Sequence, residues 1–179
     1  MSEYAARMTI KAGGEIFPGD MAPVVIGGNE TRYMTWGFPD LAGKRPHINA
    51  RSETAATSKT FGGAMADRRC LVPASGYFEW KPIDKRRKEK YSITPAGGGL
   101  MYMAGIYSPG GRFAILTCDA APEIFAIHDR MPVILSKDRA AGWLNGVPDI
   151  QLGAISGLIA APVTAAAEPP PPQMSLFDC

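Results

Sequence analysis

Three groups of polar residues interrupt segments of the sequence that are otherwise apolar. They are Asn49-Ala50-Arg51, Glu79 within ASGYFEW, and His128-Asp129-Arg130 within AIHDRMPVIL. A carboxylate held against aromatic rings has a raised pKa, which suits proton transfer near neutral pH. Histidine titrates in the same range, asparagine offers an uncharged donor to a developing oxyanion, and arginine can hold phosphate. Together these residue types predict acid–base chemistry on a phosphate-bearing ligand.

Each group also has a simpler explanation. Glu79 could point to solvent from the outer face of a strand, and His128 could be a structural side chain. Arg130 follows Asp129 directly, and such surface pairs contribute little energy. If residues 49–53 form a strand, Asn49, Arg51 and Glu53 share one face, and we interpret Glu53 as a structural partner of a neighbouring arginine.

The elements that must position these groups are mostly short strands, because β-type runs alternate with Gly, Pro, Asn or charged breaks. Strands are expected at residues 22–26, 31–36, 69–75, 77–80, 90–94, 100–107 and 112–118. Ser52 is expected to cap a helix that runs on to residue 66, although Gly62-Gly63 weakens its middle, and Ser136 a helix that ends at Asn145-Gly146. The pattern predicts an α+β fold: a single domain with a mainly antiparallel, barrel-like or sandwiched sheet and a few short helices.

The chain has 179 residues, 46% of them hydrophobic and 20% charged, which is enough for one domain with a core. A net charge of +2 gives no global basic field that would indicate nucleic acid. Two local clusters could still do so, Arg68-Arg69 and the run KRRKEK from Lys85 to Lys90. A solvated hairpin tip is the plainer interpretation of the second cluster.

Cysteine and histidine usage indicates a reduced compartment without a metal centre. The three cysteines, Cys70, Cys118 and Cys179, lack metal-ligand spacing, and there are only two histidines. No apolar run is long enough to span a bilayer, and the first residues lack the apolar core of a secretory signal. We expect a cytoplasmic, nucleoid-associated monomer without a cofactor, a metal or a membrane partner.

The composition changes from residue 160 onward. Residues 160–172 lack an amphipathic period and end in four prolines, which predicts a disordered linker after a domain at 1–159. Residues 173–178, QMSLFD, resemble the bacterial sliding-clamp-binding peptide Gln-x-x-Leu-Phe. Leu176 and Phe177 would fill an apolar pocket and Gln173 would bond at its rim. The alternative is a hydrophobic tail that folds back on the domain.

Three long motifs in order, INARSETA, CLVPASGYFEW and IHDRMPVIL, resemble the SRAP family, the SOS response-associated peptidase domain of HMCES-like proteins. MTWGFP and FAILTCDA fit the same pattern, so the resemblance spans roughly residues 15–143. It implies an α+β domain with a β-barrel-like core and a basic groove for single-stranded DNA. It also implies capture of abasic sites as a covalent DNA–protein crosslink at replication forks.

The resemblance implies roles by motif. Asn49 would hold the sugar, Glu79 would assist methionine removal and proton transfer, and His128 would protonate the sugar oxygen and promote reversal. The DNA contacts that it implies fall on Arg51, Arg130, Thr117, Trp36 and Arg69. In the family the α-amine and thiol of a cysteine at position two close a thiazolidine with the ring-opened sugar.

The sequence departs from the family at its start, which reads MSEY where the family has Met-Cys-Gly-Arg. No residue matches that cysteine. Ser2 stands at position two, but its amine and hydroxyl would close only a weaker ring. Two explanations stay open: a start codon placed too far downstream, which we favour, or a degenerate relative. The rival functions are a clamp-tethered single-strand-binding adaptor with a relic active site, and a protease acting on other proteins. Nothing in the sequence supports the protease, since no nucleophile–histidine pair is visible.

Overall fold

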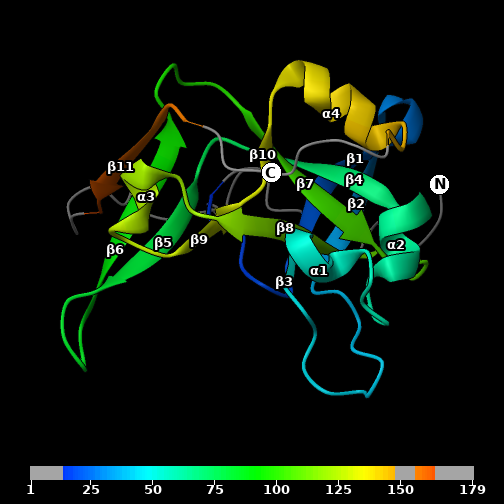
Figure 1. Cartoon of the computed structure of the whole chain (residues 1–179), viewed down its shortest axis with the longest axis horizontal. Coiled ribbons are helices and arrows are strands. Elements are labelled where there is room, and N and C mark those ends of the chain that lie inside the picture. The colour runs from blue at the N-terminus through cyan, green and yellow to red at the C-terminus, as the bar shows by residue number, and fades with distance from the viewer. Residues whose placement is uncertain (1–13, 148–155, 164–179) are drawn as a thin grey trace, which may run out of the picture.

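The structure, a computed structural model, describes residues 14–147 and 156–163 (Figure 1). Short strands dominate it, as the alternation of apolar and polar residues predicts. The elements are β1 (Met21–Ile26), η2 (Gly27–Asn29), β2 (Glu30–Trp36), β3 (Asn49–Arg51), α1 (Ser52–Ala55), α2 (Gly62–Asp67), β4 (Arg69–Ala74), β5 (Tyr77–Pro82), β6 (Lys88–Pro95), β7 (Met101–Tyr107), β8 (Arg112–Asp119), α3 (Pro122–Phe125), β9 (Arg130–Pro132), β10 (Ile134–Leu135), α4 (Lys137–Leu144) and β11 (Leu158–Pro162).

The larger sheet of the described residues has the strand order β10-β7-β4-β1-β2-β8-β3, with β9 beside β8 and a further pairing of β7 with β8. Its pairings are antiparallel except that β2 and β3 each run parallel to β8. The ring β7-β4-β1-β2-β8 is not a clean barrel, because β1 meets β4 through a single partner pair, Val25 and Leu71. The predicted α+β class with a largely antiparallel core is confirmed.

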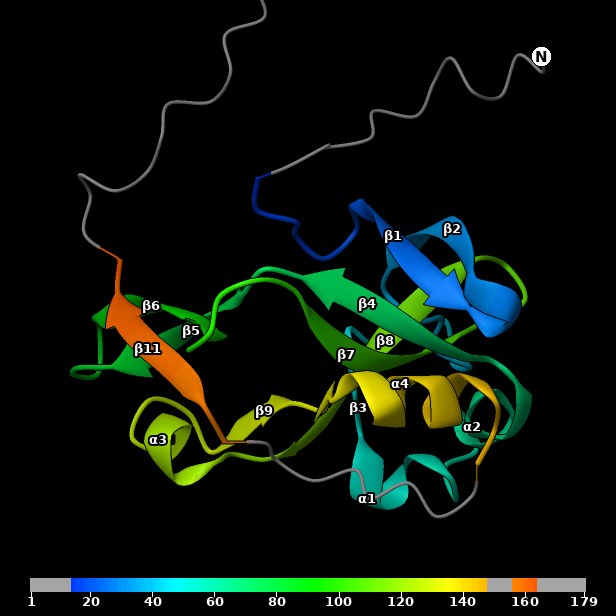
Figure 2. The same cartoon turned by 90° about the horizontal axis from the view of Figure 1, so that it is seen from above.

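A second sheet is formed by β5, β6 and β11, and Figure 2 shows it beside α3 at one end of the molecule. The chain crosses from β4 in the large sheet to β5 in the small one at Ser75-Gly76. A Cβ atom on Gly76 would lie 2.7 Å from the main-chain oxygen of Ile93, so only glycine fits this crossing. The crossing sets where β5, and with it Glu79, lies.

The core is built mainly from strands of the large sheet, with residues of the helices and of the small sheet packed against them. On β1, Ala22, Val24 and Ile26 are buried while the residues between them are less so, which is the period of a strand packed on one face. Trp143 of α4 is fully buried, and its indole N–H donates to the main-chain oxygen of Cys70 at 2.9 Å. This packing fixes β4 and the strands that pair with it.

Two expectations about local structure need correction. The helix expected from Ser52 to residue 66 is two short helices, α1 and α2, and Ser52 is not an N-cap but the first residue of α1. Thr57 donates its hydroxyl to the oxygen of Thr54, and such local bonds compete with the helix ladder. Ser136 does cap α4, since its hydroxyl accepts from the N–H of Arg139.

The expected linker also begins too early. Residues 160–162 belong to β11, which pairs with β6, and the buried side chain of Leu158 holds the strand in place. Sheet pairing satisfies backbone groups whatever the side chains are, so an alanine-rich segment can still form a strand. Residues 164–172 and the residues expected to bind a clamp, Gln173, Leu176 and Phe177, lie outside the described part. Among the described helices, none is long and apolar enough to cross a membrane.

Candidate functional site

Strand β3 presents Asn49 and Arg51 on one exposed face, with Ala50 buried between them. The strand pairs with β8, where Arg51 lies opposite Thr117. Its entry is anchored by Trp36, whose indole N–H donates to the main-chain oxygen of Ile48 at 2.9 Å. The amide and the guanidinium therefore point outward from a rigid sheet, as the alternation in the sequence predicts.

Arg130, the first residue of β9, connects three elements. Its Nη1 and Nη2 donate to Oε1 and Oε2 of Glu53 at 2.8 and 2.9 Å, and Nη1 also donates to Asp119. Nη2 donates in addition to the main-chain oxygen of Thr117 at 2.8 Å. The prediction that Glu53 is the structural partner of an arginine is confirmed, and the hydrogen bond from Arg130 lowers the pKa of Glu53.

His128 lies at the exposed turn that leads into β9. Its Nδ1 lies 3.0 Å from the main-chain N and 3.1 Å from the main-chain O of Arg130, and 3.3 Å from Oδ1 of Asp129. With its proton on Nδ1 the ring donates to that main-chain oxygen, and with its proton on Nε2 it accepts from that N–H. Either way the ring is held through Nδ1, so Nε2 is the ring nitrogen that can meet a ligand.

Glu79 lies half-buried on β5, opposite Tyr91 of β6. Burial raises the pKa of Glu79, while the charge of His128 and a hydrogen bond from the N–H of Trp80 oppose the rise. The charge of His128 therefore acts on the Glu79 carboxyl, although 49 positions separate them in sequence. The tertiary fold thus brings the predicted carboxylate and the predicted imidazole close enough for their charges to interact.

Tyr77 belongs to this site, and the analysis of the sequence did not single it out. Its hydroxyl oxygen is buried and has no hydrogen-bond partner among the described residues. Burial first, and then the charges of Glu79, Cys118 and Glu123, raise the pKa of the phenol, which keeps it a donor. The signal was available, because Tyr77 precedes Glu79 by two residues on one strand and so shares its face.

The other residues predicted to contact DNA lie elsewhere or serve the fold. Arg69 is at the far end of β4, where it stacks 4.5 Å from the ring centre of Trp143 and donates to the oxygens of Met65 and Val147. Trp36 stacks on Phe113 at 6.4 Å. Thr117 is buried in β8. We take Asn49, Arg51, Arg130, His128 and Glu79 as the candidate site; they lie on β3, β5, β9 and the turn before β9, elements that Figure 1 labels.

The two cysteines of the described part do not offer a reactive thiol. Cys70 and Cys118 are both buried, and burial raises the pKa of each thiol. Within residues 14–147 and 156–163, no three acidic, cysteine or histidine side chains gather in a way that could hold a metal ion. The site's chemistry there rests on the carboxyl, imidazole, amide and guanidinium groups.

Comparison with known proteins gives three findings. The sequence profile of the family described as SOS response associated peptidase (SRAP) matches residues 3–166. The abasic site processing protein YoaM of Bacillus subtilis is 37% identical over 106 residues, 55% of this chain and 47% of its own. Its Escherichia coli counterpart YedK is 39% identical over 118 residues, 62% of this chain and 53% of its own. The chain thus spans about half the length of these relatives.

Solved structures show the same fold. A crystallised protein from Bordetella bronchiseptica superposes with a TM-score of 0.70 at 26% identity, covering 83% of this chain and 86% of its own. One from Bacteroides thetaiotaomicron reaches 0.71 at 24% identity, covering 83% and 75%.

Proposed function

Because this chain belongs to the SOS response associated peptidase (SRAP) family, we propose that it recognises abasic sites in single-stranded DNA at replication forks. Its relatives YoaM and YedK are named abasic site processing proteins. The observation that carries the proposal is that the charge of His128 acts on the half-buried Glu79 carboxyl, in a fold that also exposes Asn49 and Arg51 on β3. An abasic nucleotide offers a sugar and a phosphate but no base, so a protein that recognises it needs hydrogen-bond donors and proton-transfer groups.

Each side chain has a part in this proposal. Asn49 donates to a sugar hydroxyl, and Arg51 pairs with the adjacent phosphate. His128, in its protonated form, donates a proton from Nε2 to the sugar ring oxygen and so assists ring opening. Glu79, whose pKa burial raises, exchanges protons with the opened sugar. Arg130 holds β9 and His128 in place through Glu53, and its contact with DNA stays a prediction.

Covalent capture is a separate step. A lasting adduct with the sugar aldehyde needs an amine and a thiol together, because an imine by itself hydrolyses. Cys70 and Cys118 are buried with raised thiol pKa values, so the described part favours binding and proton transfer without a thiol nucleophile of its own. The proposal that this chain binds abasic DNA therefore does not require that it also forms a crosslink.

The test compares oligonucleotides that differ at one position. Fluorescence anisotropy would measure Kd for single strands with a central abasic analogue and for the intact strand. We expect Asn49→Ala to weaken binding of the abasic strand about tenfold, or about 1.4 kcal/mol. Asn145→Ala, at the exposed end of α4, is the matched control and should change nothing.

Equal affinity of the wild type for the abasic and the intact strand would overturn the proposal. A denaturing gel with a true abasic site then tests capture. A heat-stable shifted band would show covalent chemistry, and its absence with retained abasic preference would leave the adaptor function. A band that persists in Asn49→Ala and in His128→Gln would contradict the roles given to these side chains.

A second candidate function, attachment to the bacterial sliding clamp, rests on the C-terminal motif QMSLFD. Leu176 and Phe177 would enter an apolar pocket of the clamp, and Gln173 would bond at the rim. Surface-immobilised clamp should bind the full chain but should not bind the double variant Leu176→Ala/Phe177→Ala. The control is Met174→Ala/Ser175→Ala, which changes only the variable positions, and equal binding by both variants would refute the attachment.

A further inference from the structure

The hairpin that joins β5 to β6 is an ordered turn. Asp84 organises it, because its Oδ1 accepts from the N–H groups of Arg86 and Arg87 at 2.9 Å each and its Oδ2 pairs with Nε of Arg87 at 2.7 Å. The N–H of Ile83 donates to the oxygen of Arg87 at 3.0 Å and closes the turn. Side chains on this turn therefore have fixed starting points.

Three cations on the hairpin have no ion-pair partner among the described residues. Lys85, Arg86 and Lys88 are exposed, whereas Arg87 is neutralised by Asp84. Placing three like charges together costs energy in the free protein, since they repel one another. A cluster left unpaired in this way favours an anionic partner.

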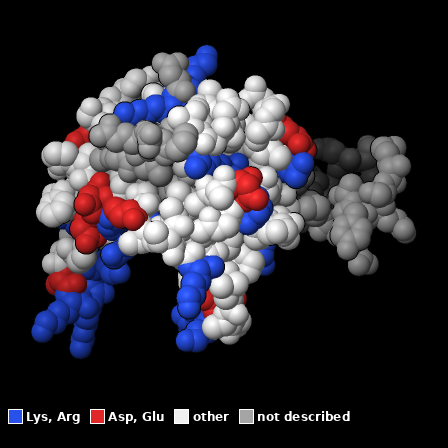
Figure 3. Space-filling view, turned by 45° about the vertical axis from the view of Figure 1, so that its right-hand side comes forward, with Lys and Arg blue, Asp and Glu red and all other residues white. Residues whose placement is uncertain are grey.

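The hairpin continues strand β5, which also carries Glu79 of the candidate site. Glu79 pairs with Tyr91, and the ladder continues to Pro82 opposite Lys88. At about 3.3 Å per residue, the strand carries the turn roughly 10 Å beyond Glu79. In Figure 1 the hairpin and the loop before β3 project from the same side of the molecule, and Figure 3 shows Lys and Arg side chains gathered on two projections there.

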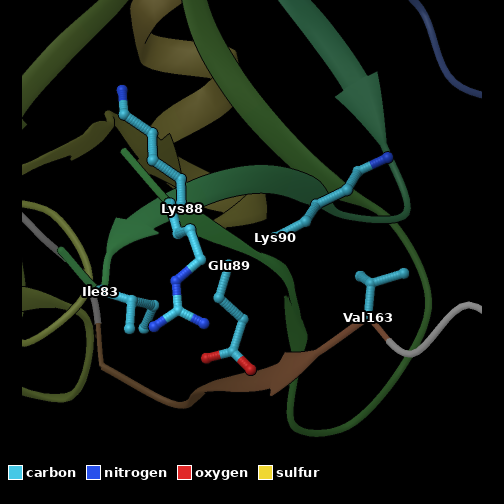
Figure 4. A pocket seen from close by; sticks show the side chains of 6 residues that line it. Ile83, Lys88, Glu89, Lys90 and Val163 are labelled. Carbon is cyan, nitrogen blue, oxygen red and sulfur yellow. The ribbon is translucent and has the colours of Figure 1, made fainter. Parts of the chain in front are cut away.

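A shallow pocket of about 460 Å³ at the base of the hairpin is not the anion site. It is lined by Ile83, Arg87, Lys88, Glu89, Lys90 and Val163. Figure 4 shows Lys88 and Lys90 directed away from Glu89, whose carboxylate lies toward the strand that ends at Val163. The carboxylate would repel an anion inside the pocket, so the cations act on the outer side of the hairpin.

From this geometry we propose that Lys85, Arg86 and Lys88 bind backbone phosphates of the DNA strand that flanks the nucleotide held at the candidate site. The inference rests on the proposed function in taking DNA as the ligand. The contacts are independent of sequence, because any strand carries the same phosphates. The hairpin thus adds affinity for the DNA strand and orients it, while Asn49, Glu79 and His128 recognise the abasic sugar.

Salt dependence tests the hairpin. For single strands, the slope of log K against log salt changes by about 0.7 per neutralised phosphate contact. Lys85→Gln/Lys88→Gln should therefore flatten the slope by about 1.4, on abasic and intact strands alike. The matched control is Lys59→Gln/Lys137→Gln, which removes two exposed lysines from the α1–α2 connection and from α4 and should leave the slope unchanged.

Asp84→Asn gives a change of opposite sign. The amide oxygen can still accept from the turn, but the charge that neutralises Arg87 is gone, so the slope should steepen by about 0.7. A slope that neither hairpin variant alters, or that the control alters equally, would overturn the inference. Because the hairpin effect is expected on intact strands too, loss of abasic preference and loss of the hairpin contact are distinguishable.

Discussion

Glu53 and Arg130 form a two-pronged ion pair that joins α1 to β9, with N–O distances of 2.8 and 2.9 Å. The main-chain N and O of Arg130 also lie 3.0 and 3.1 Å from Nδ1 of His128, so the same residue orients the imidazole. Glu53 thereby holds the site together from a position 77 residues away in sequence. The pair links stability to function.

Loss of this pair should weaken the fold and the site together. Glu53→Gln removes the charge but keeps the shape, and half of the Glu53 side chain is exposed, so we expect a loss of about 1 kcal/mol in the free energy of unfolding. Urea denaturation measures it. Glu30→Gln, which breaks the exposed pair with Arg32, is the control and should change stability less. Equal losses in both variants would show that the Glu53–Arg130 pair contributes no more to the free energy of unfolding than the exposed Glu30–Arg32 pair.

The contribution of Glu53 should depend on pH with a defined sign. Its pKa in the folded protein lies below the ordinary value of 4.5, because Arg130 stabilises the carboxylate. The contribution is therefore complete above about pH 4.5 and is lost as pH falls through the lower, folded-state pKa. The difference in stability between wild type and Glu53→Gln should be constant near neutral pH and shrink in acid. A difference that grows in acid would contradict the assignment.

Glu79 should show the opposite sign. Burial raises its folded-state pKa, so the folded protein holds the proton more tightly than the unfolded chain does. Its favourable contribution is complete below the ordinary pKa of 4.5 and is lost as pH rises through the folded-state pKa. Glu79→Gln should match the wild type in acid and be more stable at about pH 8, while proton transfer to the abasic sugar is lost. Denaturation at both pH values checks this, and lower stability of the variant at about pH 8 would contradict it.

Tyr77→Phe tests the unpartnered hydroxyl. Since the buried oxygen has no hydrogen-bond partner among the described residues, its removal should leave the free energy of unfolding unchanged or raise it by up to about 1 kcal/mol. Thermal denaturation measures this. Tyr102→Phe on β7 serves as the control for removing a hydroxyl from a strand. A loss above about 1 kcal/mol in Tyr77→Phe alone would show that the oxygen has a partner after all.

Gly76→Ala tests the crossing between the two sheets. The added Cβ would lie 2.7 Å from the oxygen of Ile93, so β5 must shift, at a cost of about 1–3 kcal/mol. Binding of abasic DNA should fall as well, because Glu79 moves with the strand. Gly97→Ala is the control: no atom lies within 4 Å of its added Cβ, so it should be neutral or slightly stabilising. Similar stability of the two variants would show that the crossing tolerates a side chain.

Much of the fold followed from local patterns. The strands from β1 to β8, apart from the three-residue β3, were expected within a few residues, because period-two burial and turn residues are local signals. The break between α1 and α2 was signalled only by Gly62-Gly63, which weakens the middle of the expected helix, and the strand at residues 160–162 was not expected. The first depends on side-chain bonds to the backbone, and the second on pairing with a distant strand. Neither of these features changes the hydrophobic periodicity of its own segment.

The sequence by itself determined the residue types of the site and the faces they occupy: Asn49 beside Arg51, Glu79 between aromatics, and His128 before Arg130. Alternation along a strand is a property of the backbone, so it can be predicted from spacing. Only the tertiary structure decided that Glu79 meets His128, that Arg130 is held by Glu53, and that Arg69 is stacked on Trp143 away from the others. Those relations depend on which strands pair and where the chain crosses between sheets, and such pairings join residues too far apart in sequence for a local pattern to specify.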